Sequence, residues 1–203
     1  MVRRGRHSGP HRRAGRGEGR VRIIGGRWRG RRLHFSAPEG LRPTPDRVRE
    51  TLFNWLQPWL PGARCLDLFA GSGVLALEAL SRGAERVVAV EREARLAAEL
   101  RERARLLDAE GLQVVCMEAA AFLDGPATPF DILFLDPPYG HGWLPRLMPR
   151  LEEGGWLAPL AHLYLEAESP IDPQGLPEGW ELIRSGRAGQ VAYHLVRREE
   201  RRS

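Results

Sequence analysis

The chain has 203 residues, which is enough for one domain with its own hydrophobic core. Its apolar runs fall short of the roughly eighteen residues that cross a membrane, so we expect no membrane partner. The two cysteines, Cys65 and Cys116, fall in separate strands predicted to be buried and lack metal-ligand spacing. This pattern predicts reduced core thiols, a cytoplasmic location and no metal site.

Positive charge is concentrated at the N-terminal end. Residues 1–32 hold twelve arginines and one acidic residue, Glu18, although the whole chain carries a net charge of only +5. A basic segment beside a mildly acidic body favours a polyanion such as nucleic acid. The chain has no lysine. Guanidinium groups bind phosphate and stack on bases, but a GC-rich genome would produce the same preference for arginine.

The N-terminal elements are predicted in chain order. Residues 1–20 contain almost nothing to bury and are predicted to be a disordered Arg-rich arm. Residues 21–45 are predicted to form an Arg-rich β-hairpin, which turns at Gly25-Gly26, followed by a proline-rich loop. Asp46 is predicted to cap a helix that ends near Gln57.

From residue 63 onward, short apolar runs alternate with helical patterns. The predicted strands are 64–69, 86–90, 112–116, 130–135, 161–167, 180–186 and 190–197. The predicted helices between them are 73–82, 92–107, 118–123 and about 143–151. Repeated β-α units favour a mostly parallel sheet with helices on both faces, and the last two strands form an antiparallel hairpin. We therefore predict one α/β domain over residues 46–203, with about seven strands. The Glu and Arg side chains of helix 92–107 are expected to face solvent.

The strand that begins at residue 64 runs into a glycine-rich turn, Asp67-Leu68-Phe69-Ala70-Gly71-Ser72-Gly73. The glycines allow the backbone to pass close to a ligand. The next strand ends in Glu91, whose carboxylate can accept hydrogen bonds from two ribose hydroxyls. A tight turn without a ligand is the alternative. The chain lacks the dinucleotide fingerprint and the Walker lysine, which argues against a dehydrogenase and an NTPase. A nucleoside cofactor without phosphate, such as S-adenosylmethionine, fits better.

The strand 130–135 runs into Asp136-Pro137-Pro138-Tyr139, the most informative stretch of the chain. An exocyclic amine of a base is a poor nucleophile, and acceptors on its hydrogens help it to attack. The Asp136 carboxylate and the Pro137 carbonyl can be those acceptors, Pro138 stiffens the turn, and Tyr139 can stack on the base. The alternative is a loop that merely ends a buried strand. In a parallel sheet this loop and the glycine turn meet at one edge, which predicts direct methyl transfer without metal.

Five stretches resemble the RsmD family, bacterial enzymes that methylate N2 of one guanine in 16S ribosomal RNA. They are VRIIGGRWRGRRL at 21–33, LRPTPDRVRETLFNWL at 41–56, LDLFAGSGVLALEALSRGA at 66–84, DPPY at 136–139 and GQVAYHLVRRE at 189–199. The resemblance implies a Rossmann-like class I methyltransferase fold, with S-adenosylmethionine as cofactor and S-adenosylhomocysteine as product. It also implies 16S ribosomal RNA as the partner, within a small-subunit assembly particle, and we expect a monomer.

The resemblance also implies roles for individual residues. The expected cofactor-binding residues are Thr44, Arg47, Asp67, Phe69, Ala70, Gly71, Ser72, Gly73, Glu91, Arg92, Glu118 and Ala119. The expected catalytic residues are Asp136, Pro137, Pro138 and Tyr139. Arg47 either pairs with the methionine carboxylate or forms a structural salt bridge. Glu118 departs from the family, which usually has Asp or Asn there.

The hairpin supplies the expected RNA-binding residues, which are Arg22, Arg27, Trp28, Arg29, Arg31 and Arg32. Trp28 either stacks on a nucleotide or anchors the hairpin to the core. Two rival functions remain open at this point: a DNA amine methyltransferase that uses the same tetrad, and a non-catalytic RNA-binding assembly factor.

Overall fold

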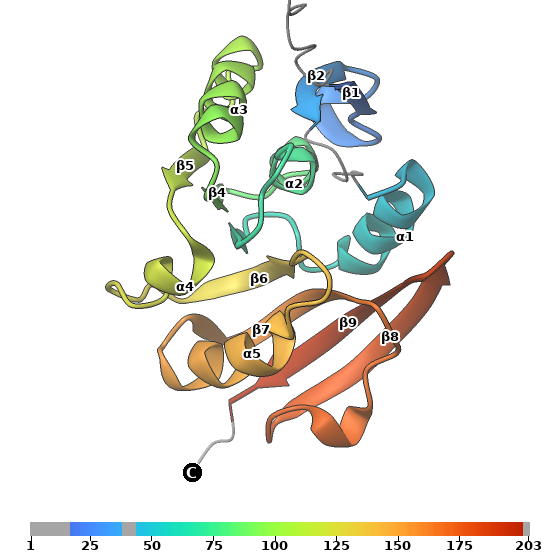
Figure 1. Ribbon diagram of the computed structural model, residues 1–203, viewed down its shortest axis with the longest axis vertical. Coiled ribbons are helices and arrows are strands. Elements are labelled where there is room, and N and C mark those ends of the chain that lie inside the picture. Colours follow the sequence, from blue (N-terminus) through green and yellow to red (C-terminus); the bar gives the residue numbers. More distant parts are fainter. Residues whose placement is uncertain (1–16, 38–43, 201–203) are drawn as a thin grey trace, which may run out of the picture.

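The computed structural model describes residues 17–37 and 44–200, and a seven-stranded sheet is its centre (Figure 1). The strand order is β5-β4-β3-β6-β7-β9-β8. The parallel strands are β3 (Arg64–Asp67), β4 (Arg86–Glu91), β5 (Leu112–Cys116), β6 (Phe130–Leu135) and β7 (Leu157–Ala167). Strands β8 (Trp180–Ala188) and β9 (Val191–Glu199) are antiparallel to their neighbours. The predicted seven-stranded, mostly parallel sheet with a terminal hairpin is confirmed.

Helices cover both faces of the sheet. One face carries α1 (Asp46–Leu56), α2 (Val74–Ser81) and α3 (Ala94–Leu106), and the other carries α4 (Ala119–Phe122) and α5 (Trp143–Glu153). Alternate residues of a strand feed the two cores: Ile132 and Phe134 lie in one, and Leu133 and Leu135 in the other. Burial on both faces explains why these strands are almost continuously apolar.

The topology reverses direction between β3 and β6. The chain passes from β3 to β4 and β5 on one side and then returns to β6 on the other side of β3. Strands β3 and β6 are parallel neighbours, with Asp67 paired to Phe134. Their carboxyl ends therefore open at the same edge of the sheet, where open α/β folds bind ligands.

The N-terminal hairpin is formed by β1 (Gly17–Arg22) and β2 (Arg32–Ala37), with the short 3-10 helix η1 (Gly26–Trp28) between them. It lies beside α1 and α2 (Figure 1). Residues 17–20 were expected in the arm, and this boundary was wrong because their backbone pairs with β2. The rest of the predicted arm, residues 1–16, lies outside the described residues.

The buried carboxylate of Glu78 in α2 ties the hairpin to the domain. It accepts hydrogen bonds from the backbone amides of Ile24 and Gly25, both at 2.8 Å. It also accepts from Arg82 Nε at 2.7 Å, and Arg49 Nη1 lies 3.5 Å away. The Glu78 and Arg49 side chains are both 0% exposed. A buried charge that is paired on all sides in this way is a structural group.

Two local predictions were wrong. Asp46 is the first residue of α1 and does not cap it; Pro45 holds the cap position, and the Asp46 carboxylate instead pairs with Arg22 and Arg49. Cys116 is exposed, whereas Cys65 is buried as expected. The reason is position, because Cys116 ends β5, which is an edge strand with only one neighbour. None of the helices in the described ranges has the length and apolar character needed to span a membrane.

Candidate active site

The glycine turn after β3 is held tightly against its neighbours. The Ala70 amide donates to the Val90 carbonyl at 2.9 Å, and the Gly73 amide donates to the Ala70 carbonyl at 2.6 Å. Gly73 has a φ of 75° and directly precedes α2. A Cβ at Gly73 would lie 2.2 Å from Cδ1 of Leu100 in α3. The turn thus needs glycine for both its left-handed backbone and its close packing.

Asp67, at the end of β3, is a buried carboxylate with an unused acceptor. Its side chain is 1% exposed, and Oδ1 accepts a long hydrogen bond of 3.3 Å from the Phe69 amide. Oδ2 has no hydrogen-bond partner among the described residues. Burial raises the pKa of Asp67 to about 7, and the charge of Glu91 adds to the rise. Such a group is costly by itself, so it fits a cationic ligand.

Glu91, at the end of β4, is fixed by two backbone amides. Oε2 accepts from Gly71 at 2.7 Å, and Oε1 accepts from Glu93 at 2.8 Å. A carboxylate oxygen has capacity for a second hydrogen bond, so Glu91 can still bind a pair of hydroxyls. Beside it, Arg92 and Glu118 form an exposed ion pair with a 3.8 Å N–O distance. Glu118 therefore lies at this edge of the sheet with its charge already paired.

Asp136 lies beside a second carboxylate, Glu166, which the sequence analysis missed. Glu166 lies near the end of β7, next to β6, and is 4% exposed. The Thr44 hydroxyl is 3.1 Å from Glu166 Oε1 and 3.4 Å from Asp136 Oδ2, and the Tyr164 hydroxyl donates to Glu166 Oε1 at 2.7 Å. Thr44 thus contacts this carboxylate pair, which places it beside the tetrad.

The two carboxyl groups have raised pKa values for a clear reason. Burial raises the pKa of Asp136 well above its usual value, and the neighbouring Glu166 and Asp67 add to the rise. Burial also raises the pKa of Glu166, although hydrogen bonds from Tyr164 and Thr44 oppose this effect. No arginine pairs with Asp136 or Glu166 among the described residues. Clustered, unneutralised carboxyls with perturbed pKa values are typical of functional sites.

A cavity of about 390 Å³ lies beside the tetrad loop. Its lining includes Pro137, Pro138, Tyr139, Trp143, Glu166 and Glu168. Tyr139 is about half exposed, which leaves part of its ring free for stacking. Phe69 of the glycine turn contacts Trp143 edge-on, with ring centroids 5.5 Å apart. The glycine turn therefore contacts, through these rings, a residue that lines the tetrad cavity.

Two buried arginines position this region, and neither was expected to do so. Arg47, the expected cofactor residue, is exposed and forms no ion pair among the described residues. Its neighbour Arg49 is the buried one, and its Nε donates to the Thr44 carbonyl at 3.1 Å. Arg103 of α3 was expected to face solvent, but it is buried and donates to the carbonyls of Ser72 and His34 at 2.5 and 2.9 Å. Arg103 thus joins the hairpin to the glycine turn.

The remaining expected cofactor residues lie just after the ends of β3 and β5. Ala70 and Ser72 are buried within the glycine turn, and Ala119 is buried at the start of α4, directly after Glu118. Their side chains are small, and their backbone lies at the same sheet edge as Asp67 and Glu91.

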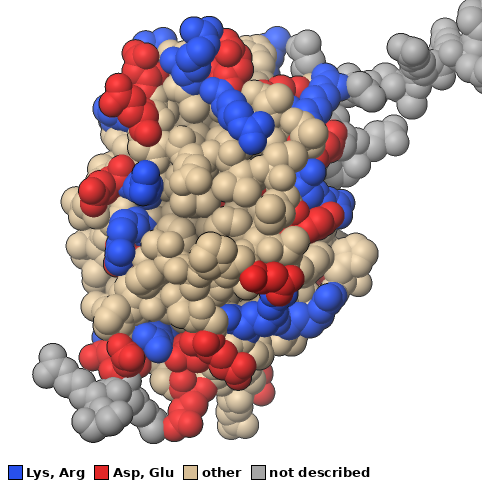
Figure 2. All heavy atoms as spheres, turned by 90° about the vertical axis from the view of Figure 1, so that its left-hand side faces the viewer, with Lys and Arg blue, Asp and Glu red and all other residues tan. Residues whose placement is uncertain are grey.

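The hairpin presents arginines and hides its tryptophan. Arg22, Arg27, Arg29, Arg31 and Arg32 are all exposed. Trp28 is only 8% exposed, its amide donates to Ser81 Oγ at 2.9 Å, and the Arg27 guanidinium lies 4.0 Å from its ring centroid. Of the two alternatives for Trp28, the structure supports the anchor. By contrast, the face that carries α3 and β5 mixes basic and acidic side chains around an uncharged centre (Figure 2).

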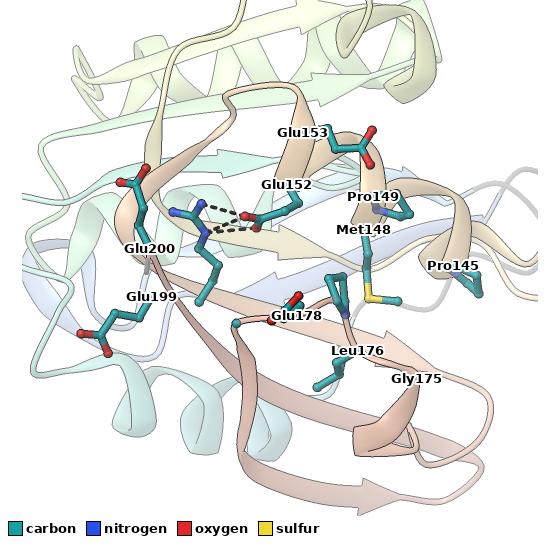
Figure 3. Close-up of a pocket in the computed structure, with 13 residues that line it drawn as sticks. Pro145, Met148, Pro149, Glu152, Glu153, Gly175, Leu176, Glu178, Glu199 and Glu200 are labelled. Carbon is teal, nitrogen blue, oxygen red and sulfur yellow. Dashed lines mark hydrogen bonds and ion pairs between the residues drawn. The ribbon is translucent and has the colours of Figure 1, made fainter. Parts of the chain in front are cut away.

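A larger cavity of about 650 Å³, which none of the expected site residues lines, lies between α5 and the segment before β8 (Figure 3). Several glutamates line it. Arg198 donates to Glu152 at 2.7 Å across it, and Trp180 Nε1 donates to the same carboxylate at 2.8 Å. These contacts join α5 to the terminal strands, so the paired charges there are structural.

Comparisons with known proteins identify the family. The family model described as conserved hypothetical protein 95 matches residues 21–197. The ribosomal RNA small subunit methyltransferase D of Escherichia coli (strain K12) is 48% identical over 183 residues, which cover 90% of this chain and 92% of that protein. The protein of the same name from Haemophilus influenzae is 43% identical, over 88% of this chain and 94% of that protein.

A solved structure is similar to this protein as well. The Escherichia coli protein yhhF superposes with a TM-score of 0.82 at 47% identity, covering 90% of this chain and 100% of that chain. The family model begins at residue 21, so it covers the end of β1 and all of β2 as well as the sheet. The chain belongs to the conserved hypothetical protein 95 family, which is the RsmD family that the sequence motifs resemble.

Proposed function

We propose that the protein is an S-adenosylmethionine-dependent methyltransferase that methylates N2 of a guanine in 16S ribosomal RNA. One observation carries the proposal: Asp136 and Pro137 follow β6, directly beside the Asp67–Gly73 turn that follows β3. This arrangement brings acceptors for an amine next to a turn suited to a nucleoside. The names of the relatives, ribosomal RNA small subunit methyltransferases, support the same substrate class.

The residues present fit the cofactor. S-adenosylmethionine supplies a methyl group on a positively charged sulfonium. The unpartnered Oδ2 of Asp67 suits the ammonium of its methionine part, and the fixed carboxylate of Glu91 suits the two ribose hydroxyls. Gly71 and Gly73 let the backbone approach closely. An ion pair between Asp67 and this ammonium would offset the free-energy cost of burying the carboxylate.

The tetrad would activate the amine by accepting its hydrogens. The Asp136 carboxylate and the Pro137 carbonyl each accept one N–H, which favours a pyramidal nitrogen with its lone pair free to attack. As the nitrogen gains positive charge, Asp136 stabilises that charge and takes the proton. Tyr139 stacks on the ring and fixes the base in the cavity. Because Asp136 must accept, it has to be ionised when the base is bound.

The exposed arginines of the hairpin would bind phosphates next to the target. Each contact releases counterions from the RNA, so binding depends on salt. The target base must lie in a loop or be extruded from a helix to reach the cavity. We further propose that the enzyme acts as a monomer in the cytoplasm, on RNA in a small-subunit assembly particle.

The test is methylation of 16S ribosomal RNA from a strain that lacks the protein. The purified protein and labelled S-adenosylmethionine should produce N2-methylguanosine, identified by mass spectrometry of the digested RNA. Naked RNA and partly assembled particles are compared in parallel, and duplex DNA serves as the rival substrate. Methylation of DNA alone, or of another amine in the RNA, would overturn the proposal. Failure to bind the cofactor in calorimetry would favour a non-catalytic assembly factor.

A further inference from the structure

We infer that Glu166 is a specificity-determining residue, which accepts the N1–H of the target guanine while Asp136 and Pro137 accept the two hydrogens of N2. The inference rests on the proposed guanine-N2 activity. In this inference, a residue of β7 selects the base, whereas the Asp136–Tyr139 loop activates the amine.

The geometry brings the acceptors together. Strands β6 and β7 are parallel neighbours, with Leu135 paired to Leu165, so Asp136 and Glu166 are the next residues on adjacent strands. The Thr44 hydroxyl lies within 3.4 Å of both carboxyl groups. Glu166 and Pro137 also line the same 390 Å³ cavity as Tyr139. A base that stacks on Tyr139 would meet Glu166 and Pro137 in this cavity. Asp136 lies next to both, since it precedes Pro137 in the chain and contacts the same Thr44 hydroxyl as Glu166.

Glu166 is held in place and keeps capacity to accept. Its Oε1 accepts from the hydroxyls of Tyr164 and Thr44. Its carboxylate accepts no N–H hydrogen bond and pairs with no arginine among the described residues. Two other buried carboxylates are matched by such donors: Glu78 by two amides and Arg82, and Glu91 by two amides. The missing donors are those that a ligand would supply.

Guanine has the matching pattern of donors. It carries N1–H and, beside it, the two hydrogens of N2, which makes three donors for three acceptors. Adenine and cytosine also carry an exocyclic amine, but the ring nitrogen beside it is an acceptor. That lone pair would face the Glu166 carboxylate, and a buried acceptor left unpaired is costly. In the free protein, burial and the neighbouring Glu166 raise the pKa of Asp136, so a proton can be shared between the two carboxyls; guanine binding releases this proton to solvent.

The test uses a guanine analogue that lacks the N1–H together with the O6 carbonyl. 2-Aminopurine keeps the exocyclic 2-amine, but its N1 is an acceptor. It is placed at the methylated position of RNA, in whichever form the wild type methylates. For the wild type, we expect kcat/KM to fall by about 100-fold or more from guanine to 2-aminopurine, because sites built to bind an N–H reject analogues that lack it. Because the loss of O6 is common to both enzymes, the change between them reports the N1 contact; for Glu166→Gln, whose amide can donate to N1, we expect the ratio to shrink below about tenfold.

Two further variants complete the test. Tyr164→Phe removes a hydrogen bond that fixes Glu166, so it should lower the same ratio by a smaller factor. Glu181→Gln makes the same chemical change on β8, where Glu181 is an exposed partner of Arg197, and should leave the ratio unchanged. The ratio is measured within each variant, so a partial loss of folded protein does not alter it.

The outcomes separate the two proposals. If the wild type methylates no guanine N2 in ribosomal RNA, the proposed function fails. If the wild type does so, but Glu166→Gln and Tyr164→Phe keep the wild-type preference for guanine over 2-aminopurine, only the role of Glu166 is overturned.

Discussion

Glu78 and Asp67 are both buried carboxylates, and they belong to one continuous segment of chain. Asp67 ends β3, and Glu78 lies in α2, which follows the glycine turn. Glu78 accepts from two backbone amides and from Arg82, with Arg49 also nearby. Asp67 accepts a long hydrogen bond from the Phe69 amide and keeps an oxygen unpartnered among the described residues.

The difference separates structural from functional charge. Glu78 is matched by the donors that the fold supplies, so it holds the hairpin in place. Asp67, Asp136 and Glu166 lie at one edge of the sheet with few donors and raised pKa values. Such carboxyl groups lower the stability of the fold unless a ligand donates hydrogen bonds to them. Buried polar groups without partners are expected mainly at functional sites.

The largest expected effect is the loss of Asp136. Asp136→Ala should lower single-turnover methyl transfer to 16S ribosomal RNA by between about 100-fold and 1000-fold, because it removes an acceptor used in the transition state. Cofactor affinity, measured by calorimetry, should stay largely intact. The free protein should not lose stability, since the change removes a buried carboxyl that lies beside Glu166 and has few hydrogen-bond donors. Unchanged turnover would exclude Asp136 from the mechanism.

The opposite result is expected for Glu78. Glu78→Ala should lower the free energy of unfolding by about 3–5 kcal/mol, because Arg82 and the amides of Ile24 and Gly25 lose their acceptor, and Arg49 keeps only the half-exposed Asp46. Urea unfolding followed by circular dichroism measures this change. Glu102→Ala is the matched control, since Glu102 forms an exposed pair with Arg105 and should cost at most about 1 kcal/mol. Equal losses in both variants would contradict the structural role of Glu78.

Asp67 predicts a pH dependence of cofactor binding. Its pKa in the free protein is about 7, and its charged form is the one that attracts an ammonium group. As the pH falls from 7 to 5.5, the ionised fraction drops, so the affinity for S-adenosylmethionine should fall by roughly tenfold. Glu91 and Asp136 also influence this region electrostatically, so the matched control is Asp67→Asn. Calorimetry should show a flatter profile for that variant; an unchanged slope would assign the titration to another group.

The smallest effects are expected at the arginines of the hairpin. Arg29 and Arg31 are exposed and pair with no carboxylate among the described residues. Replacing either with Ala should lower RNA affinity a few-fold and reduce the slope of log affinity against log salt by about 0.7–0.9 for each phosphate that is no longer neutralised. Deletion of residues 1–16, which hold six arginines, should reduce the slope further. Arg105→Ala on α3 is the control, and an equal change there would contradict a hairpin-specific effect.

Much of the fold could be predicted because its signals are local. The strands 112–116 and 130–135 have the bounds that their apolar runs predicted, since Gly111 precedes the first, and Pro129 and Asp136-Pro137 flank the second. The meeting of the glycine turn and the tetrad also followed from sequence, because a parallel sheet places the carboxyl ends of its strands at one edge. The specific reaction was predicted from the resemblance of the motifs to the family.

The missed residues depend on tertiary partners. Arg49 lies in phase with Phe53 and Leu56 on the apolar face of α1, and Glu78 lies in an otherwise apolar helix. A charge in such a position signals a buried ion pair, but sequence does not show which two charges meet. Glu166 carried a weaker signal, a carboxylate near the end of the strand after the tetrad. Its proximity to Asp136 required the strand order.

The docking of the hairpin on α2 has a mechanical consequence. Ile24 and Gly25 are bonded to Glu78, and Ser81 on the same helix contacts Gly25 and Trp28. The helix that starts at the glycine turn is thus the rigid mount for the arginines. If those arginines grip the RNA as proposed, the span from the gripped phosphates to the cavity is constant. The nucleotide that is modified is then the one that the shape of the RNA places at this fixed distance from the bound phosphates.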